Sequence, residues 1–289
     1  MNKLLLFSIL FVLSFNWISA QITVKNAKKL ETKLRNQHLY VVISDTSLKK
    51  LYKKALEGIT IFDSVFFISE KRFESNIQPN NCYLSSMRFF SIYGTNGNYR
   101  LMNYLMIFSP GQKSVEEFKY YHFIKLQAVD EYAFFPIELK KIGNGFRPNF
   151  GVLRNNFQQL SKSLDLDKDL KYNQDFSNSN ALSALKHDTL LVVLDDVKDT
   201  ATINLFSKNY PYKYAFISNE AHEKKILTSG KSFYYMHFSL PEENFHNQIS
   251  IVNSATGLEV FHEKIMVMNN EYEISDKRLF ILIDKINGL

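Results

Sequence analysis

Two continuous apolar runs predict buried strands, one near the start of the chain and one in its second half. The first is Val41-Val42-Ile43 and the second spans residues 191–194. Runs of β-forming residues without polar alternation are typical of strands that helices cover on both faces, as in parallel sheets. We therefore expect an α/β fold.

Amphipathic helices are expected beside both strands, because apolar residues recur at helical spacing. Gly58 is predicted to end the helix that follows the first strand, and Pro211 the helix that follows the second. A further helix is expected before each strand. The apolar positions that carry these predictions are Leu30 and Leu34, then Leu48, Leu51, Tyr52, Ala55 and Leu56 in the first half, and Leu182 and Leu185, then Ile203, Leu205 and Phe206 in the second.

Antiparallel hairpins are predicted later in each half. Residues 87–93 and 99–108 flank Asn96-Gly97, a dipeptide that accepts the positive φ angles of a tight turn. In the second half, residues 233–240 and 248–253 form the corresponding pair, and a further hairpin passes through Thr256-Gly257.

A closing helix is predicted at the end of the chain. Leu279, Leu282, Ile283 and Ile286 fall at helical spacing, and Ser275 can cap the segment. Residues 279–283 are unbroken and apolar, so a strand is the alternative.

Several segments occur twice in the same order, which predicts an internal duplication. Identity is low, and coincidence is the alternative explanation. The corresponding segments are residues 39–45 with 190–196, 67–70 with 216–219, 104–111 with 249–257, 131–132 with 271–272, and 141–143 with 285–288.

The duplication suggests a domain division. We predict a leader over residues 1–20, a first α/β domain over 21–146 and a second over 189–289. Residues 147–188 are interpreted as a bridging helix, carrying Leu153, Phe157, Leu160 and Leu164, followed by a looser linker. Within that linker, residues 175–180 are polar and are expected to be its most flexible part.

The first residues resemble a secretory signal peptide. Lys3 precedes an apolar run over residues 4–15, and Ile18-Ser19-Ala20 ends with a small residue, so cleavage is expected after Ala20. A retained anchor is the alternative, but the run is shorter than the roughly 20 apolar residues that span a bilayer. The mature chain is expected to be periplasmic or secreted, with no further membrane-spanning segment.

Composition limits the classes of partner and of redox chemistry. The formal charge of +6 makes the chain mildly basic, and its lysines occur in short runs that are typical of solvated helix faces. Export further disfavours nucleic acid as a partner. Cys82 is the only cysteine, so an intrachain disulfide is impossible. Cys82 is expected to be a buried, structural thiol.

The order of elements, in which two strand–helix units precede an antiparallel hairpin and a final helix, resembles the thioredoxin-like fold, and most closely over residues 190–289. The resemblance implies two tandem domains, each a mixed sheet flanked by helices. Where that family has Cys-x-x-Cys, this chain has Asp45-Thr46-Ser47 and residues 196–199, and Asn247-Gln248 stands in place of the expected proline. The family's redox activity is therefore not expected.

Other chemical motifs are incomplete, so we predict no catalytic residue, no metal ligand and no cofactor. His222-Glu223 and His262-Glu263 lack the second histidine of a zinc-protease helix and are interpreted as surface residues. A calcium loop, a phosphate-binding loop and a nucleophile elbow are likewise incomplete or absent. The remaining weak candidates are Asp165, Asp167 and Asp169, with Leu170 and Phe176 at positions that calcium loops give to Gly and Glu, and a scattered group of His237, Glu242, Glu243 and His246.

Asp195 and Asp196 end the second buried strand, at the edge where α/β proteins tend to bind ligands. Their alternative role is to cap the next helix, since short acids at such turns accept hydrogen bonds from free backbone N–H groups. Capping is the favoured interpretation.

These observations together predict an exported, non-catalytic binding or assembly protein with an unknown protein or small-molecule partner. An extracytoplasmic hydrolase or metal-dependent enzyme, with a site assembled from distant residues, is the alternative. A surface-associated structural protein is the third hypothesis.

Overall fold

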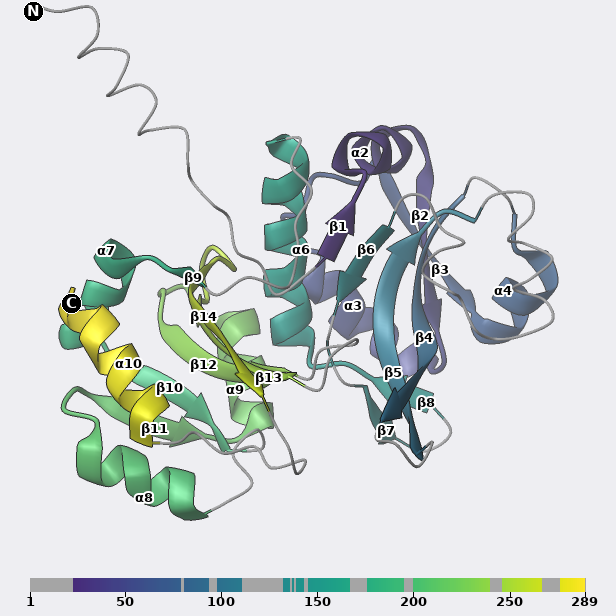
Figure 1. Cartoon of the computed structure of the whole chain (residues 1–289). Coiled ribbons are helices and arrows are strands. Elements are labelled where there is room, and N and C mark those ends of the chain that lie inside the picture. Colours follow the sequence, from purple (N-terminus) through teal and green to yellow (C-terminus); the bar gives the residue numbers. More distant parts are fainter. Residues whose placement is uncertain are drawn as a thin grey trace, which may run out of the picture.

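The computed structural model describes residues 23–78, 81–93, 98–110, 132–135, 137, 139–142, 145–166, 176–194, 200–239, 246–266 and 276–288. Over these residues the chain is a mixed α/β protein with two six-stranded sheets and one two-stranded sheet. Figure 1 shows how the sheets and helices are arranged. The expected α/β class, with two mixed sheets flanked by helices, is confirmed. The predicted leader and its cleavage site lie outside the described residues.

The first sheet is built around β2 (His38–Ile43), the strand predicted from the first apolar run. It lies parallel to β3 (Ser64–Ser69) on one side and to β4 (Cys82–Tyr93) on the other. Antiparallel strands continue the sheet from β4 in the order β5 (Asn98–Phe108), β6 (Tyr132–Phe135) and β1 (Thr23–Lys25). The helical segments are α2 (Ala27–Asn36), η1 (Thr46–Leu48), α3 (Lys49–Ala55), α4 (Glu70–Asn76) and α6 (Phe150–Asp165).

The second sheet is built around β10 (Leu190–Val193), which is buried along its whole length. It lies parallel to β11 (Tyr214–Ile217) and to β12 (Tyr234–Ser239). Antiparallel strands then follow in the order β13 (His246–Asn253), β14 (Glu259–Met266) and β9 (Phe176–Ser177). The helical segments are α7 (Ser179–Leu182), η3 (Ser183–Lys186), α8 (Thr200–Asn209), α9 (Asn219–Thr228) and α10 (Asp276–Asn287).

The two sheets have the same strand order and the same strand directions. The first reads β3-β2-β4-β5-β6-β1 and the second β11-β10-β12-β13-β14-β9. In the first, Tyr40 lies opposite Phe66 and Tyr83; in the second, Leu191 lies opposite Ala215 and Tyr235. Positions 40 and 191, 66 and 215, and 83 and 235 therefore correspond, in agreement with the sequence matches at residues 39–45 and 67–70.

The two halves also share a helix cap and a ring contact at corresponding positions. Ser69 caps α4 by accepting from the Arg72 N–H at 3.3 Å, and Ser218 caps α9 by accepting from the Ala221 N–H at 3.3 Å. One turn into each helix, the ring of Phe73 lies 5.1 Å from that of Tyr83, and the ring of His222 lies 4.3 Å from that of Tyr235. The helix after the second parallel strand thus places a ring against the same strand position in both halves.

Two sequence-based expectations are wrong. Residues 141–143 do not correspond to 285–288, because β7 (Lys140–Ile142) pairs with β8 (Gly145–Arg147), whereas Lys285 and Ile286 lie in α10. Residues 176–180 are not a loose linker, because β9 pairs with β14 and the Asn178 side chain accepts from the Ala181 N–H at 3.1 Å to cap α7. In both places strand pairing decides the local structure: β7 pairs with the neighbouring β8, and β9 pairs with β14 from a distant part of the chain.

The predicted bridging helix forms as α6, and it lies between the two sheets in Figure 1. The side of the helix that carries Leu153, Phe157, Leu160 and Leu164 is buried in the first core, between α2 and α3. Its other side contacts α9, with Gly151 at the contact. A Cβ atom at Gly151 would lie 3.0 Å from Cβ of Ile226, so a small residue allows the two helices this close approach.

Candidate functional site

The acidic turn after the first strand has a capping role. Asp45 Oδ1 accepts a hydrogen bond from the Ser47 N–H at 2.8 Å at the start of η1. That backbone donor, followed by the Ser47 hydroxyl, lowers the pKa of the Asp45 carboxyl. Asp195 and Asp196, the matching acids of the second half, lie outside the described residues, so their capping or ligand-binding role stays a prediction.

The single cysteine is buried, as expected. Cys82 begins β4 and lies beside Leu39 of β2 in the sheet register. Its Sγ atom lies 3.4 Å from Oε1 of Gln37, and the residue belongs to the first hydrophobic core. A thiol in this position has the surroundings of a structural residue.

Ser250, Glu259 and His262 form a buried polar cluster on β13 and β14. The Ser250 hydroxyl donates to Glu259 Oε1 at 2.6 Å, and Nδ1 of His262 lies 3.1 Å from the same oxygen and 3.2 Å from Ser250 Oγ. In a catalytic Ser–His–acid set, serine and acid contact opposite ring nitrogens. Here both contact Nδ1, and the Glu259 and His262 side chains are 0% exposed, so the cluster has the geometry of a structural network.

The expectation that His222-Glu223 and His262-Glu263 are ordinary surface residues is wrong, because His222, Glu223 and His262 are buried. Glu223 lies in α9 but interacts with the segment that leads into α6. It forms an ion pair with Arg147, and its Oε2 accepts from the Phe150 N–H at 2.8 Å. Glu223 therefore satisfies a free backbone donor at the N-terminus of α6.

Three amide side chains of α6 bind the turn between β13 and β14. Asn155 Nδ2 donates to the Ser254 carbonyl at 3.0 Å, Gln158 Nε2 to the Ala255 carbonyl at 3.0 Å, and Gln159 Nε2 to the Gly257 carbonyl at 2.6 Å. Asn155 Oδ1 also accepts from the Tyr235 hydroxyl at 2.8 Å. These bonds use the polar side of α6 to fix the second sheet against it.

The scattered histidines are not brought together. His237 lies opposite Ser250 in the pairing of β12 with β13, whereas His246 lies four residues before Ser250, about 13 Å along the strand. Glu242 and Glu243, and Asp167 and Asp169 of the incomplete calcium loop, lie outside the described residues. Asp165 ends α6.

Two absences concern the described residues alone. They contain no group of three or more His, Cys, Asp or Glu side chains arranged to hold a metal ion. No helix among them has both the length and the apolar character needed to cross a membrane.

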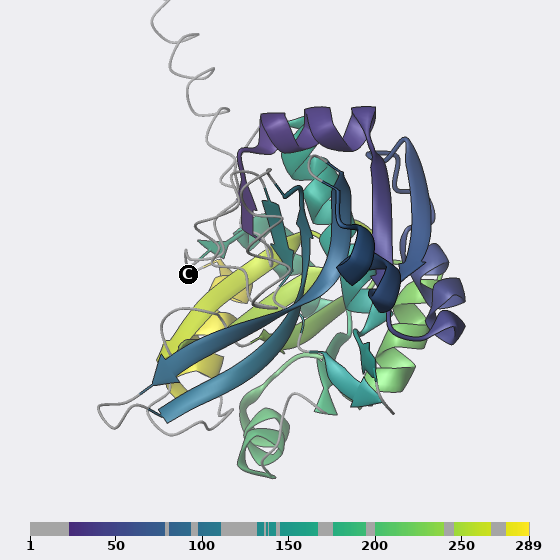
Figure 2. The same ribbon diagram turned by 90° about the vertical axis from the view of Figure 1, so that its right-hand side faces the viewer.

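An exposed aromatic surface that was not predicted from the sequence lies at the β3 edge of the first sheet. Strand β3 is on the right-hand side of the molecule in Figure 1, the side that faces the viewer in Figure 2. We call this surface the aromatic edge, and it consists of His38 and Tyr40 on β2 and Phe66 on β3. The Phe66 ring lies 4.9 Å from that of His38 and 5.7 Å from that of Tyr40, and Nδ1 of His38 forms a hydrogen bond with the Ser64 hydroxyl. Phe66 is 47% exposed.

A sequence signal for the aromatic edge does exist. His38 and Tyr40 are two residues apart, as are Ser64 and Phe66, so each pair lies on one face of its strand. The missing information was that β2 and β3 are neighbours, with Tyr40 opposite Phe66.

Comparisons of the chain with models of protein families, with curated proteins and with solved structures found no match.

Proposed function

We propose that this chain is an exported, non-catalytic binding and assembly protein made of two α/β units that arose by duplication. The shared strand order, the capping serines at positions 69 and 218, and the matching ring contacts at Tyr83 and Tyr235 support the duplication. The thioredoxin-like resemblance stays a prediction, and the proposal does not depend on it.

The observation that carries the binding function is the exposure of Phe66 in the aromatic edge. At the corresponding position of the second sheet the residue is Ala215, so this architecture does not require an aromatic side chain there. Exposed aromatic residues are enriched in protein interfaces, where they supply much of the binding energy. We therefore assign the aromatic edge to binding a protein partner.

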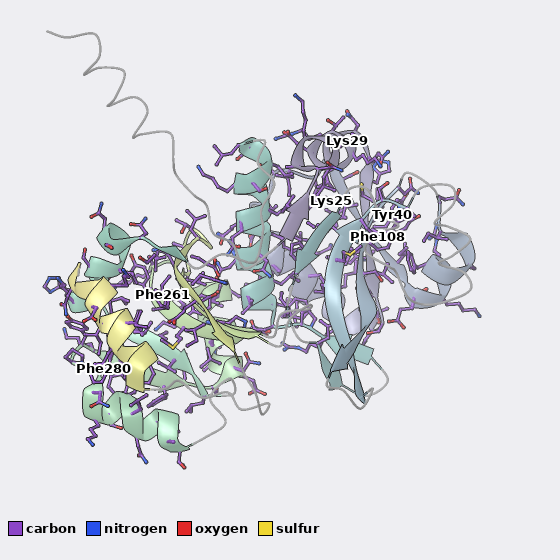
Figure 3. The ribbon with its side chains drawn as sticks, viewed as in Figure 1. Lys25, Lys29, Tyr40, Phe108, Phe261 and Phe280 are labelled. Atoms are coloured by element: carbon purple, nitrogen blue, oxygen red, sulfur yellow. The ribbon has the colours of Figure 1, made fainter. Side chains whose placement is uncertain are left out.

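A site-specific photo-crosslinker at position 66 tests this function in the exported protein. We expect a discrete protein adduct at position 66, which Tyr40→Ala in the same chain weakens. Position 280 is the control, because Phe280 of α10 is 49% exposed and lies on the far half of the molecule in Figure 3. Equal labelling at both positions, or no adduct at position 66, would contradict the proposal.

The non-catalytic part of the proposal is tested by a redox assay. Dithiol exchange needs an attacking and a resolving thiol, and Cys82 is the only cysteine of the chain. We expect the purified protein to be unable to reduce insulin in the presence of a thiol donor. Activity that disappears in Cys82→Ser would refute the non-catalytic assignment.

A further inference from the structure

Strand β3 forms an edge of the first sheet, and no strand in the described part of the chain pairs with its outer side. Natural edge strands are usually protected by charged residues, proline, a bulge or short length. The six residues of β3, Ser-Val-Phe-Phe-Ile-Ser, include no charge and no proline. The corresponding edge strand β11 has only four residues and begins three residues after Pro211. The first sheet therefore presents the less protected edge.

We propose that this edge pairs with β3 of a second copy of the chain, antiparallel, with Phe66 at the twofold axis. The inference rests on the proposed function, because it names the partner of the same aromatic edge. In this register Phe66 lies opposite its own copy, Val65 opposite Phe67, and Ser64 opposite Ile68. Asp63 lies opposite Ser69, so no like charges face each other.

The side chains that would face each other across the proposed pair favour a second β3 as the partner strand. Residues opposite each other in antiparallel strands have their side chains on the same face, which allows the two Phe66 rings to pack together outside the sheet. On the other face, Phe67 lies beneath the Lys49 ammonium group, 5.5 Å from the ring centroid, and pairs with Val65 of the copy. A twofold contact of this kind is closed, so it gives a dimer and not a fibre.

The contact involves one strand and a small aromatic surface, so the association is expected to be weak, with Kd on the order of 10 µM to 1 mM. Sedimentation of the mature protein over this concentration range measures it. We expect concentration-dependent dimers that Phe66→Lys abolishes and Phe280→Lys leaves unchanged. A monomer at all concentrations, or equal loss in both variants, would overturn the proposal.

The register is tested by disulfide trapping in a Cys82→Ser background. Phe66→Cys places two thiols opposite each other, with Cβ atoms about 5 Å apart, close enough for a disulfide under mild oxidation. Ser69→Cys is the matched control on the same strand, because position 69 lies opposite position 63 of the copy, roughly 20 Å from its own counterpart. Position 69 is exposed, so reactivity alone would trap both variants equally.

We expect covalent dimers from Phe66→Cys at least tenfold faster than from Ser69→Cys, with both variants keeping the circular dichroism of the parent. Mixing Asp63→Cys with Ser69→Cys should also give a disulfide-linked pair. Equal rates would refute the register. A monomeric protein that still forms the adduct at position 66 with another protein would refute self-pairing and leave the proposed function intact.

Discussion

At the residue scale, Gly257 combines a left-handed backbone with contact to α6. Its φ is +69°, and an added Cβ would lie 2.5 Å from the Asn155 carbonyl oxygen. Gly58 has a similar φ of +79° with nothing within 4 Å of that position, so it is a control for backbone strain alone. We expect Gly58→Ala to lower the free energy of unfolding by about 1–2 kcal/mol and Gly257→Ala by about 3–5 kcal/mol. If urea denaturation gave equal losses of unfolding free energy for the two variants, α6 would have to move aside at this contact without a measurable cost.

Tyr52 is a buried phenol that links stability to alkaline pH. Burial in the first core, and then the nearby Glu70 carboxylate, raise its pKa above the ordinary value of 10.0. Below pH 10 the phenol is protonated in both states; above it, the unfolded chain ionises first and the folded state is destabilised. Above pH 10 the free energy of unfolding should therefore fall less steeply in Tyr52→Phe than in the parent protein, with a difference of up to about 1.4 kcal/mol per pH unit. Parallel stability curves for the two proteins, measured by urea denaturation from pH 8 to 11, would contradict this.

At the element scale, α6 was predicted from its apolar spacing, but the role of its polar side was not. Asn155 and Gln159 are buried although they lie away from the Leu153 and Phe157 side of the helix. Spacing identifies the side that faces the nearest core, whereas burial of the polar side depends on a second sheet from a distant part of the chain. His222 and His262 were mistaken for surface residues because the side chains that cover them, Tyr235 for His222 and Ser250 for His262, come from other elements of the second half.

The amide contacts of α6 can be tested in order of burial. Asn155→Leu deprives the Tyr235 hydroxyl of this acceptor and the Ser254 carbonyl of this donor, so we expect a loss of about 2–4 kcal/mol. Gln158→Ala removes a similar bond at an exposed position and should cost less than about 1 kcal/mol. Urea denaturation measures both losses, and hydrogen exchange should show faster opening at residues 254–257 in Asn155→Leu. A larger effect of Gln158→Ala would mean that the exposed contact holds the turn.

At the scale of the whole molecule, one helix is packed against both halves, so unfolding should be cooperative. The only tryptophan of the chain is Trp17, in the predicted leader, so tyrosine fluorescence and far-ultraviolet circular dichroism are suitable probes of the mature protein. We expect both probes to report one coincident urea transition, because loss of α6 opens the first core and removes the contacts of α6 with α9 and with the turn between β13 and β14. Two separate transitions would show that the halves unfold independently. In Asn155→Leu the two probes should coincide less well, because this variant weakens the contact between the halves.

The place of α6 in the chain also has a consequence for folding during synthesis. Apart from Leu227, every buried residue of the first core lies between Val24 and Leu164. Domains generally fold as units from the N-terminus when a chain emerges progressively, from a ribosome or from a translocation channel. The first unit can therefore complete its core, α6 included, before residues 176–288 are available. The second unit then folds against a preformed row of amide donors, and the order of emergence determines which half serves as the template.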